Sequence, residues 1–377
     1  MKITLLSWNE RSKYLAELLR GSSVYEIVNV LEINASVWGQ RLSQAEGAPL
    51  VMSVGRGMDL YRQGFSEAFL MPSLNENTNI SYLSLLQAYG ILQDKLYYAP
   101  AGIFTRGEQA DRICRYQDNR ELEALEIHIA DSCNLHCRNC TMMADLAPRP
   151  GFADYEETRE GLLLFRHCFD HVKIFRILGG EPMLNPELPR YVRLVRSLFP
   201  DTDLRLATNG LLVLSAADEL LECLQDQRVR LFISYYQRQP DCMEEIHRRL
   251  EAFSVMHHIT APLTCFQKVY NLAGDTDRDF AFSSCLWRKN GCETLRGHEL
   301  SACFVPTVLP FLTDHFHIRA PGDGRIDLRE PGLTAQEIRR RLEIPMETCR
   351  FCALHGYTEP WSQLAGSEKD QRSSWSL

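Results

Sequence analysis

The chain has 377 residues, of which 45% are hydrophobic, and it carries a formal net charge of −8 at pH 7. This length predicts two or three domains, and the negative charge argues against nucleic acid or an anionic membrane surface as a partner. No stretch approaches the roughly 20 apolar residues that span a bilayer, and Met1–Trp8 lacks the features of a signal peptide, so we expect a cytoplasmic protein with no membrane partner.

Residues 1–118 show strands alternating with helices, which predicts a parallel sheet. The expected strands are 2–7, 25–31, 49–54 and 68–72, and a helix is expected at 11–20. This pattern resembles the Rossmann-like domain at the front of some sugar-modifying acyltransferases. No glycine lies between Trp8 and Lys13, so the phosphate-binding Gly-x-Gly-x-x-Gly motif is missing. We therefore expect a docking or structural role, or a divergent ligand site, rather than dinucleotide binding.

Three cysteines follow the next expected strand, Ala124–Ala130, with the spacing Cys-x3-Cys-x2-Cys. They are Cys133, Cys137 and Cys140. Three thiolates on one loop can hold a [4Fe–4S] cluster and leave one iron without a protein ligand, and an open metal position can bind substrate or cofactor. A zinc knuckle that uses His136 is the alternative, but zinc sites usually show paired Cys-x2-Cys or Cys/His spacing.

Three further motifs follow in order along the chain, each at the end of an expected strand. The first strand ends in Gly-Gly-Glu-Pro at 179–182, the second in Thr-Asn-Gly at 208–210, and the third contains Ser234. Taken alone, the glycine motifs are turn signals and the serine is an ordinary strand residue. Jointly, the cysteine loop and these motifs, over roughly residues 121–260, resemble the radical SAM enzymes.

The resemblance implies a partial (β/α)6 barrel, open on one side, over residues 119–265. Helices are expected at 158–169, 186–199, 216–226 and 243–253. Barrels of this kind bind ligands at the C-terminal ends of their strands, where all four motifs fall. The fold class expected for the whole chain is therefore α/β, with a Rossmann-like domain before the barrel and an irregular iron–sulfur domain after it.

The resemblance also implies roles for individual residues. The [4Fe–4S] cluster is expected on the three loop cysteines. Two glycines allow close approach of a ligand, and Glu181 can accept a hydrogen bond from the ammonium of S-adenosylmethionine. Many family members carry an aromatic residue before the third cysteine, where this chain has Asn139, so we expect an adenine contact there through the backbone. The expected S-adenosylmethionine site is Gly179, Gly180, Glu181, Pro182, Thr208, Asn209, Ser234 and Asn139.

Residues 266–360 are irregular and rich in Cys, Gly and Arg. The runs 292–303 and 349–352 resemble the SPASM or twitch extensions of radical SAM enzymes, which hold auxiliary clusters, and the Thr-Leu-x-Gly centre of the first predicts a β-hairpin. Five cysteines compete for four positions. We expect one cluster of the twitch type on Cys292, Cys303, Cys349 and Cys352, with Cys285 replacing one of them or unused. A structural zinc on the same thiolates is the alternative.

The remaining features yield no catalytic residue. Residues 361–377 are polar and Ser-rich, which predicts a mobile tail. Cysteines outside the two clusters are expected to be packing residues, although an epimerase would need a hydrogen donor such as Cys242, Cys265 or Cys285. His257 and His258 are expected to be structural.

The resemblance implies that one electron cleaves S-adenosylmethionine to a 5′-deoxyadenosyl radical, which abstracts hydrogen from a substrate carbon. An electron donor such as flavodoxin or ferredoxin is then required. The Rossmann-like domain favours oxidation or epimerisation of a sugar, nucleotide-sugar or small metabolite. The alternatives are a ribosomal peptide maturase that forms a thioether, a C–C crosslink or an epimer, and a non-catalytic metal-binding scaffold.

Overall fold

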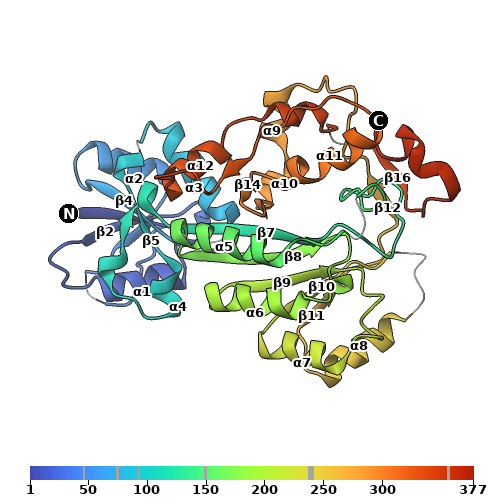
Figure 1. Cartoon of the computed structure of the whole chain (residues 1–377). Helices are drawn as coiled ribbons and strands as arrows, with labels where there is room; N and C mark the ends of the chain where they lie inside the picture. Colours follow the sequence, from blue (N-terminus) through green and yellow to red (C-terminus); the bar gives the residue numbers. More distant parts are fainter. Residues whose placement is uncertain (46, 74–75, 92, 148–150, 237–241, 355–356) are drawn as a thin grey trace. The chain divides into compact units, whose positions relative to one another are not determined.

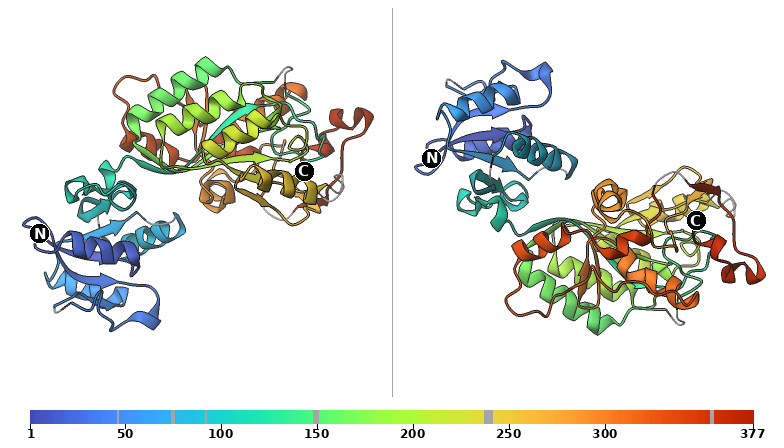
Figure 2. Two further views of the ribbon diagram at one scale, coloured as in Figure 1. Left: turned by 90° about the horizontal axis from the view of Figure 1, so that it is seen from below. Right: turned by 90° about the horizontal axis from the view of Figure 1, so that it is seen from above.

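The computed structural model describes residues 1–45, 47–73, 76–91, 93–147, 151–236, 242–354 and 357–377. The chain divides into two compact units, Met1–Glu121 and Leu122–Leu377 (Figures 1 and 2). The further boundaries predicted at residues 265 and 360 fall inside the second unit and stay predictions. Among the described residues, no helix has both the length and the apolar character that a membrane crossing requires.

The first unit is built on a six-stranded sheet in the order β3-β2-β1-β4-β5-β6. The first five strands pair in parallel, and β6 is antiparallel to β5. Separate apolar clusters surround Leu15 and Tyr82. The predicted parallel sheet is therefore present. Its strands are β1 Lys2–Leu6, β2 Glu26–Leu31, β3 Leu50–Met52, β4 Ala68–Pro72, β5 Leu96–Ala99 and β6 Cys114–Arg115, and its helices are α1 Glu10–Leu18, α2 Val54–Arg62, α3 Glu76–Ala88 and α4 Ala101–Thr105.

The second unit contains an eight-stranded sheet in the order β11-β10-β9-β8-β7-β13-β14-β15. The pairs β8–β9, β9–β10, β10–β11 and β7–β13 are parallel, which confirms the α/β class. The strands are β7 Glu121–Ala130, β8 His171–Gly179, β9 Asp203–Thr208, β10 Arg230–Ile233, β11 His257–Ile259, β13 Thr294–Arg296, β14 Glu299–Ser301 and β15 Ile326–Asp327.

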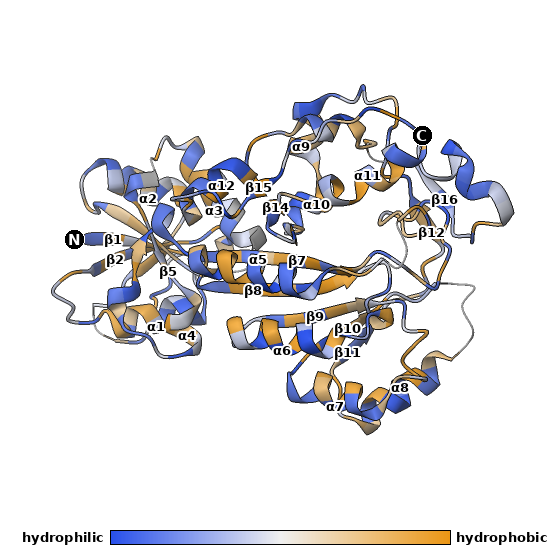
Figure 3. Ribbon diagram, in the orientation of Figure 1, coloured by the Kyte–Doolittle hydropathy of each residue, from blue (hydrophilic) through white to orange (hydrophobic). Residues whose placement is uncertain are grey.

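Four helices follow β7 to β10 and alternate with the strands, at the positions that the sequence predicts. They are α5 Tyr155–Cys168, α6 Leu188–Leu198, α7 Asp218–Asp226 and α8 Met243–Ala252 (Figure 1). The helix-covered face of the strands is apolar: the ring of Phe175 lies 5.8 Å from that of Phe199, which in turn contacts Phe165 of α5. The hydrophobic character of β7 and β8 is visible in Figure 3. The parallel strands are thus anchored on their helix-covered face, and their C-terminal ends meet at one edge.

The later part of the second unit is built from four helices and a small sheet. The helices are α9 Arg278–Ser284, α10 Leu286–Lys289, α11 Val305–His315 and α12 Ala335–Leu342. Strands β12 Cys265–Gln267 and β16 Thr358–Pro360 pair antiparallel. The predicted hairpin is present as β13 and β14. Because β13 also pairs with β7, this hairpin extends the sheet that contains β7 to β11.

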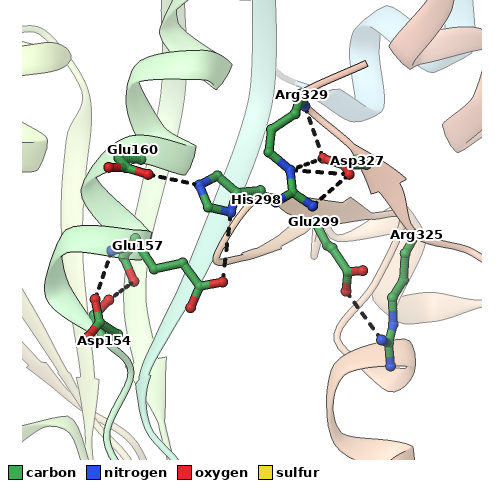
Figure 4. A network of polar contacts seen from close by, with 9 residues as sticks. Asp154, Glu157, Glu160, His298, Glu299, Arg325, Asp327 and Arg329 are labelled. Atoms are coloured by element: carbon green, nitrogen blue, oxygen red, sulfur yellow. Dashed lines mark hydrogen bonds and ion pairs between the residues drawn. The ribbon is translucent and has the colours of Figure 1, made fainter.

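The turn of that hairpin lies against α5. A Cβ atom added to Gly161 of α5 would lie 1.8 Å from the carbonyl oxygen of Gly297, so only glycine permits this approach. Next to the turn, His298 Nε2 lies 3.3 Å from Glu160 and His298 Nδ1 lies 3.7 Å from Glu157 (Figure 4). Close backbone packing and these polar contacts hold the hairpin on α5.

Residues 361–377 differ from the predicted mobile tail because they are packed. Trp361 is 5% exposed and Trp375 is 1% exposed. The backbone N–H of Leu377 donates to the carbonyl of Tyr270 at 3.1 Å, and Leu272 N donates to Ser376 Oγ at 2.9 Å. The prediction of a mobile tail rests on the polar average composition of this segment, which also contains two tryptophans. Burial of these large rings stabilises an ordered segment.

Candidate functional site

The three loop cysteines lie directly after the C-terminal end of β7, and the structure brings them together. Cys137, Leu135 and Trp361 form a small buried apolar cluster against which Cys133 and Cys140 pack. Burial raises the pKa of the Cys133 thiol to about 12, and the neighbouring Cys140 raises it further against opposing backbone hydrogen bonds. Burial likewise raises the pKa of the Cys137 and Cys140 thiols. Binding of a metal therefore requires these thiols to release protons.

Hydrogen-bond donors are directed at two of these sulfurs. The indole N–H of Trp361 donates to Cys137 Sγ at 3.3 Å. The backbone N–H of Leu135 donates to Cys133 Sγ at 3.4 Å, and the Asn209 amide lies 3.8 Å from the same sulfur. Donors placed in this way favour the thiolate over the thiol and are a feature of iron–sulfur sites, whose reduction potentials depend on hydrogen bonds to sulfur.

The C-terminal segment covers this loop, which the sequence reasoning did not anticipate. Arg138 N donates to the carbonyl of Ser362 and Asn139 N to that of Ser374, each at 2.9 Å. Leu364 N donates to the carbonyl of His136 at 2.7 Å. The signals for this contact in the sequence are Trp361 and Trp375, two large apolar residues in an otherwise polar stretch.

Gly179 and Gly180 end β8 where that strand meets the cysteine loop. Gly179 has φ +144°, and a Cβ atom there would lie 2.0 Å from the carbonyl oxygen of Ala130. A Cβ atom on Gly180 would lie 2.4 Å from the carbonyl oxygen of Ser132. Gly180 N and Glu181 N donate to these two carbonyls at 2.7 and 2.9 Å. The glycines thus permit close approach of the backbone to Ala130 and Ser132, which lead into the loop that carries the cysteines.

Glu181 is completely buried and joins the ends of two strands. Its Oε1 accepts hydrogen bonds from Thr208 Oγ1 at 2.8 Å and Met183 N at 3.0 Å, and its Oε2 accepts one from Asn209 N at 2.8 Å. Burial raises the pKa of this carboxyl, while the three donors oppose that shift. Pro182 begins the short 3-10 helix Pro182–Leu184. The carboxylate is held rigidly, with about one of its four acceptor positions left.

The other residues predicted to contact S-adenosylmethionine lie near this edge. Ser234 follows β10, and its N–H donates to the carbonyl of Thr208 at 2.9 Å. The Asn209 amide donates to Asn134 Oδ1 of the cysteine loop at 2.7 Å. Asn139 has φ +59°, a conformation that asparagine tolerates better than bulky residues. Its side-chain amide donates to Glu359 at 2.9 Å, so that amide is engaged with β16.

Four cysteines line a second site, a cavity of about 160 Å³ in the C-terminal part of the unit. They are Cys285, Cys303, Cys349 and Cys352. Burial raises the pKa of each of the last three thiols, and proximity to Cys285 adds to the effect in each case. The four thiols therefore face one another closely enough to interact electrostatically, as ligands of one cluster must.

Cys292, predicted as a ligand of this cluster, is not brought to the cavity. It lies beside Glu126 of β7, which hydrogen-bonds to its thiol, and near Arg176. The reason is the pairing of β13 with β7, which places Thr294 opposite Glu126 and directs the start of the hairpin toward the sheet. Cys285 takes the fourth position of the cavity instead.

The candidate hydrogen donors and the two histidines lie elsewhere. Cys265 is exposed and Cys242 partly buried. His257 Nε2 lies 2.6 Å from His247 Nδ1 on the helix side of the sheet, while the ring of His258 lies 5.6 Å from that of Phe232. Across the described residues, no three His, Cys, Asp or Glu side chains are grouped tightly enough to hold a single metal ion.

Comparison with known proteins finds a family match over the strands that carry the candidate site. Residues 127–250 match the family model described as Radical SAM superfamily. A GTP 3',8-cyclase of Microcystis aeruginosa is 36% identical over 131 residues, which make up 33% of this chain and 38% of that protein. A GTP 3',8-cyclase of Sulfurimonas denitrificans is 30% identical over 110 residues, 27% of this chain and 32% of that protein. The chain thus spans about a third of the length of these curated relatives.

Two solved structures give fold matches with low scores. BtrN in complex with AdoMet and 2-DOIA is 15% identical and covers 62% of this chain and 94% of its own, with a TM-score of 0.40. Native anSMEcpe with bound AdoMet is 20% identical and covers 36% of this chain and 42% of its own, with a TM-score of 0.30.

Proposed function

We propose that this chain, whose residues 127–250 form a radical SAM domain, is an enzyme that removes a hydrogen atom from a carbon of its substrate. When bound, a [4Fe–4S] cluster and S-adenosylmethionine supply the 5′-deoxyadenosyl radical that such chemistry needs. The protein supplies binding, orientation and exclusion of side reactions. The observation that carries the proposal is the meeting of three cysteines, one buried and two partly buried, and a buried, fixed carboxylate at one edge of a parallel sheet.

The residues at this edge fit the two cofactors. Cys133, Cys137 and Cys140 would hold the cluster and leave one iron open. Glu181 would accept the ammonium of S-adenosylmethionine on its remaining acceptor position, because its other positions are occupied by donors from β9 and its own loop. The proximity of Glu181 raises the pKa of the Cys133 thiol, so the carboxylate and the cluster ligand are electrostatic neighbours. Ser234 at the end of β10 would contact the ribose.

We propose a second iron–sulfur cluster in the cavity lined by Cys285, Cys303, Cys349 and Cys352. A cluster with four protein ligands mostly transfers electrons. This ligand set favours oxidation of the substrate, since the second cluster can accept the electron left on the substrate after hydrogen abstraction. We further propose that the substrate is a sugar, nucleotide-sugar or small metabolite, and that a cytoplasmic flavodoxin or ferredoxin is the electron donor.

Release of 5′-deoxyadenosine tests the proposal. The full chain would be reconstituted anaerobically with iron and sulfide, checked for iron content, and mixed with S-adenosylmethionine and a strong reductant. We expect release from the wild type and none from the triple variant Cys133→Ala/Cys137→Ala/Cys140→Ala. Equal release from both proteins would identify a contaminant. A cluster-loaded wild type that neither binds S-adenosylmethionine nor releases 5′-deoxyadenosine would contradict the proposal.

A further inference from the structure

Three arginines lie in one row across the barrel strands. Arg176 of β8 is the register partner of Arg205 of β9, and Arg205 is the partner of Arg230 of β10. Partners in a parallel sheet point to the same side, so these side chains share one face. Leu206 and Leu231, which follow Arg205 and Arg230, belong to the helix-covered core. The arginines therefore occupy the face of β8, β9 and β10 opposite that core.

A row of three positive charges on neighbouring strands lowers the stability of the fold unless negative groups neutralise it. Like charges directly opposite one another on neighbouring strands repel, and both faces of a parallel sheet are usually apolar. Arg176 is paired with Glu126 at 3.1 Å and Arg205 with Asp203 at 2.6 Å. Arg230 has no hydrogen-bond or ion-pair partner among the residues that the structure describes. Among the described residues, two carboxylates thus face three guanidinium groups, and one positive charge has no carboxylate partner.

The row is partly exposed and lies on strands that end at the cofactor edge. The side chains of Arg176 and Arg205 are 20% and 24% exposed. The guanidinium of Arg205 lies 4.9 Å from the ring centre of Phe232, which is nearer the C-terminal end of its strand. Arg205 precedes Thr208 by three residues, which at the rise of a β-strand corresponds to about 10 Å. A group bound by the row would thus lie within the length of a small metabolite from the radical site.

The same row also touches the segment that leads to the second cysteine site. Arg176 donates to the carbonyls of Gly291 at 2.6 Å and Asn290 at 3.1 Å. Asn290 is one of the residues that line the cavity of the four cysteines. Arg176 is thus fixed by the C-terminal region, and the arginine row lies between the edge that carries Glu181 and the wall of that cavity.

We propose that this row, Arg176, Arg205 and Arg230, binds an oxyanion of the substrate, a phosphate or a carboxylate. Guanidinium groups present a planar set of donors that matches the oxygens of both anions. The inference rests on the proposed function, because it places the substrate on this face of the radical SAM domain. It assigns the substrate to anionic small molecules.

Anion binding to the cluster-loaded full chain tests this inference. Pyrophosphate and succinate would be titrated separately by calorimetry at low salt in the presence of S-adenosylmethionine. We expect one of the two probes to bind, and the probe that binds identifies the phosphate or the carboxylate class. Arg230→Gln and Arg205→Gln should each weaken binding by about 10-fold, the effect of losing one charge-assisted hydrogen bond. Because Arg230 has no described partner, its replacement should leave folding intact.

Arg340→Gln is the matched control. Arg340 is an exposed arginine of α12 that pairs with Glu337, so its loss changes the net charge equally without touching the row. The inference is overturned if neither probe binds, if both row variants bind like the wild type, or if Arg340→Gln weakens binding equally. Affinity for S-adenosylmethionine and release of 5′-deoxyadenosine, measured on the same samples, report the proposed function separately. A protein that retains both but fails the anion test refutes only the arginine row.

Discussion

Glu181→Gln tests how the carboxylate at the end of β8 contributes to cofactor binding. The substitution keeps the shape of the side chain but removes its charge and one of its two acceptor oxygens. In the structure, the two oxygens accept from Thr208, Met183 and Asn209. If the amide oxygen keeps the two donors at the Oε1 position, the amide nitrogen faces the N–H of Asn209. The variant therefore leaves at least one buried donor unsatisfied and weakens the bond to an ammonium ligand.

The expected magnitude follows from these contacts. A hydrogen bond to a charged group contributes about 1.5–3 kcal/mol, which corresponds to an affinity for S-adenosylmethionine about 10- to 150-fold lower. The unsatisfied buried donor should also lower the free energy of unfolding by about 1–3 kcal/mol. The affinity would be measured by anaerobic calorimetric titration of reconstituted protein, and the free energy by denaturant unfolding.

The control is Glu187→Gln, since Glu187 lies just before α6 and pairs with the exposed Arg190. This variant should bind S-adenosylmethionine like the wild type, because its carboxylate is outside the cofactor edge. An unchanged affinity in Glu181→Gln, at an iron content equal to that of the wild type, would refute the assignment of Glu181 as the acceptor of the cofactor ammonium.

Three further predictions concern other parts of the second unit. Cys285→Ser should lower the iron content by about four atoms per chain, whereas Cys292→Ser should leave it unchanged; equal losses would refute the cavity as the second cluster site. Trp361→Phe removes an N–H donor from a cluster sulfur, so a potentiometric titration should show that cluster's reduction potential shifted by about 40 mV toward negative values. Trp375→Phe is the control: the indole of Trp375 donates to a backbone carbonyl, and its loss should leave the potential unchanged. Burial and a neighbouring guanidinium lower the pKa of His128 from 6.5 to about 3. Between these pH values the imidazole is protonated in the unfolded state and neutral in the folded state. The free energy of unfolding should therefore fall by about 1.4 kcal/mol per pH unit as the pH drops from 6.5 toward 3. His128→Leu should flatten that slope in urea unfolding curves, and an unchanged slope would contradict the buried neutral imidazole.

The sequence predicts the strands, the helices and the cysteine loop well because local patterns determine them. Leu125, Ile127 and Ile129 alternate along β7, and all three are completely buried. The Cys-x3-Cys-x2-Cys spacing lies on one loop, so no long-range contact is needed to bring its thiols together. The sequence likewise predicts that the glycines at the end of β8 permit a close approach. In the structure, the group that approaches them is the backbone at the start of the cysteine loop.

The choice between Cys285 and Cys292 could not be made from spacing. Both precede the same hairpin, and Cys292 is nearer to Cys303 along the chain. What separates them is the pairing of β13 with β7, a contact between segments about 170 residues apart that no local pattern reveals. The packed C-terminal segment was missed for a related reason, because its contacts with the cysteine loop depend on Trp361 and on backbone hydrogen bonds over more than 200 positions.

The C-terminal region is therefore part of the candidate site. It contributes an N–H donor to the cysteine loop, four cysteines to the second cavity, and two carbonyl groups that fix Arg176 on the face of the sheet opposite the helix-covered core. The family match ends at residue 250, before all of these groups. In the function that we propose, the matched residues would generate the radical, whereas the second cavity, which lies outside the match, would accept the electron of the substrate. The groups that we propose to act on the substrate therefore come from two parts of the chain: the arginine row lies within the matched residues, and the second cavity lies after them.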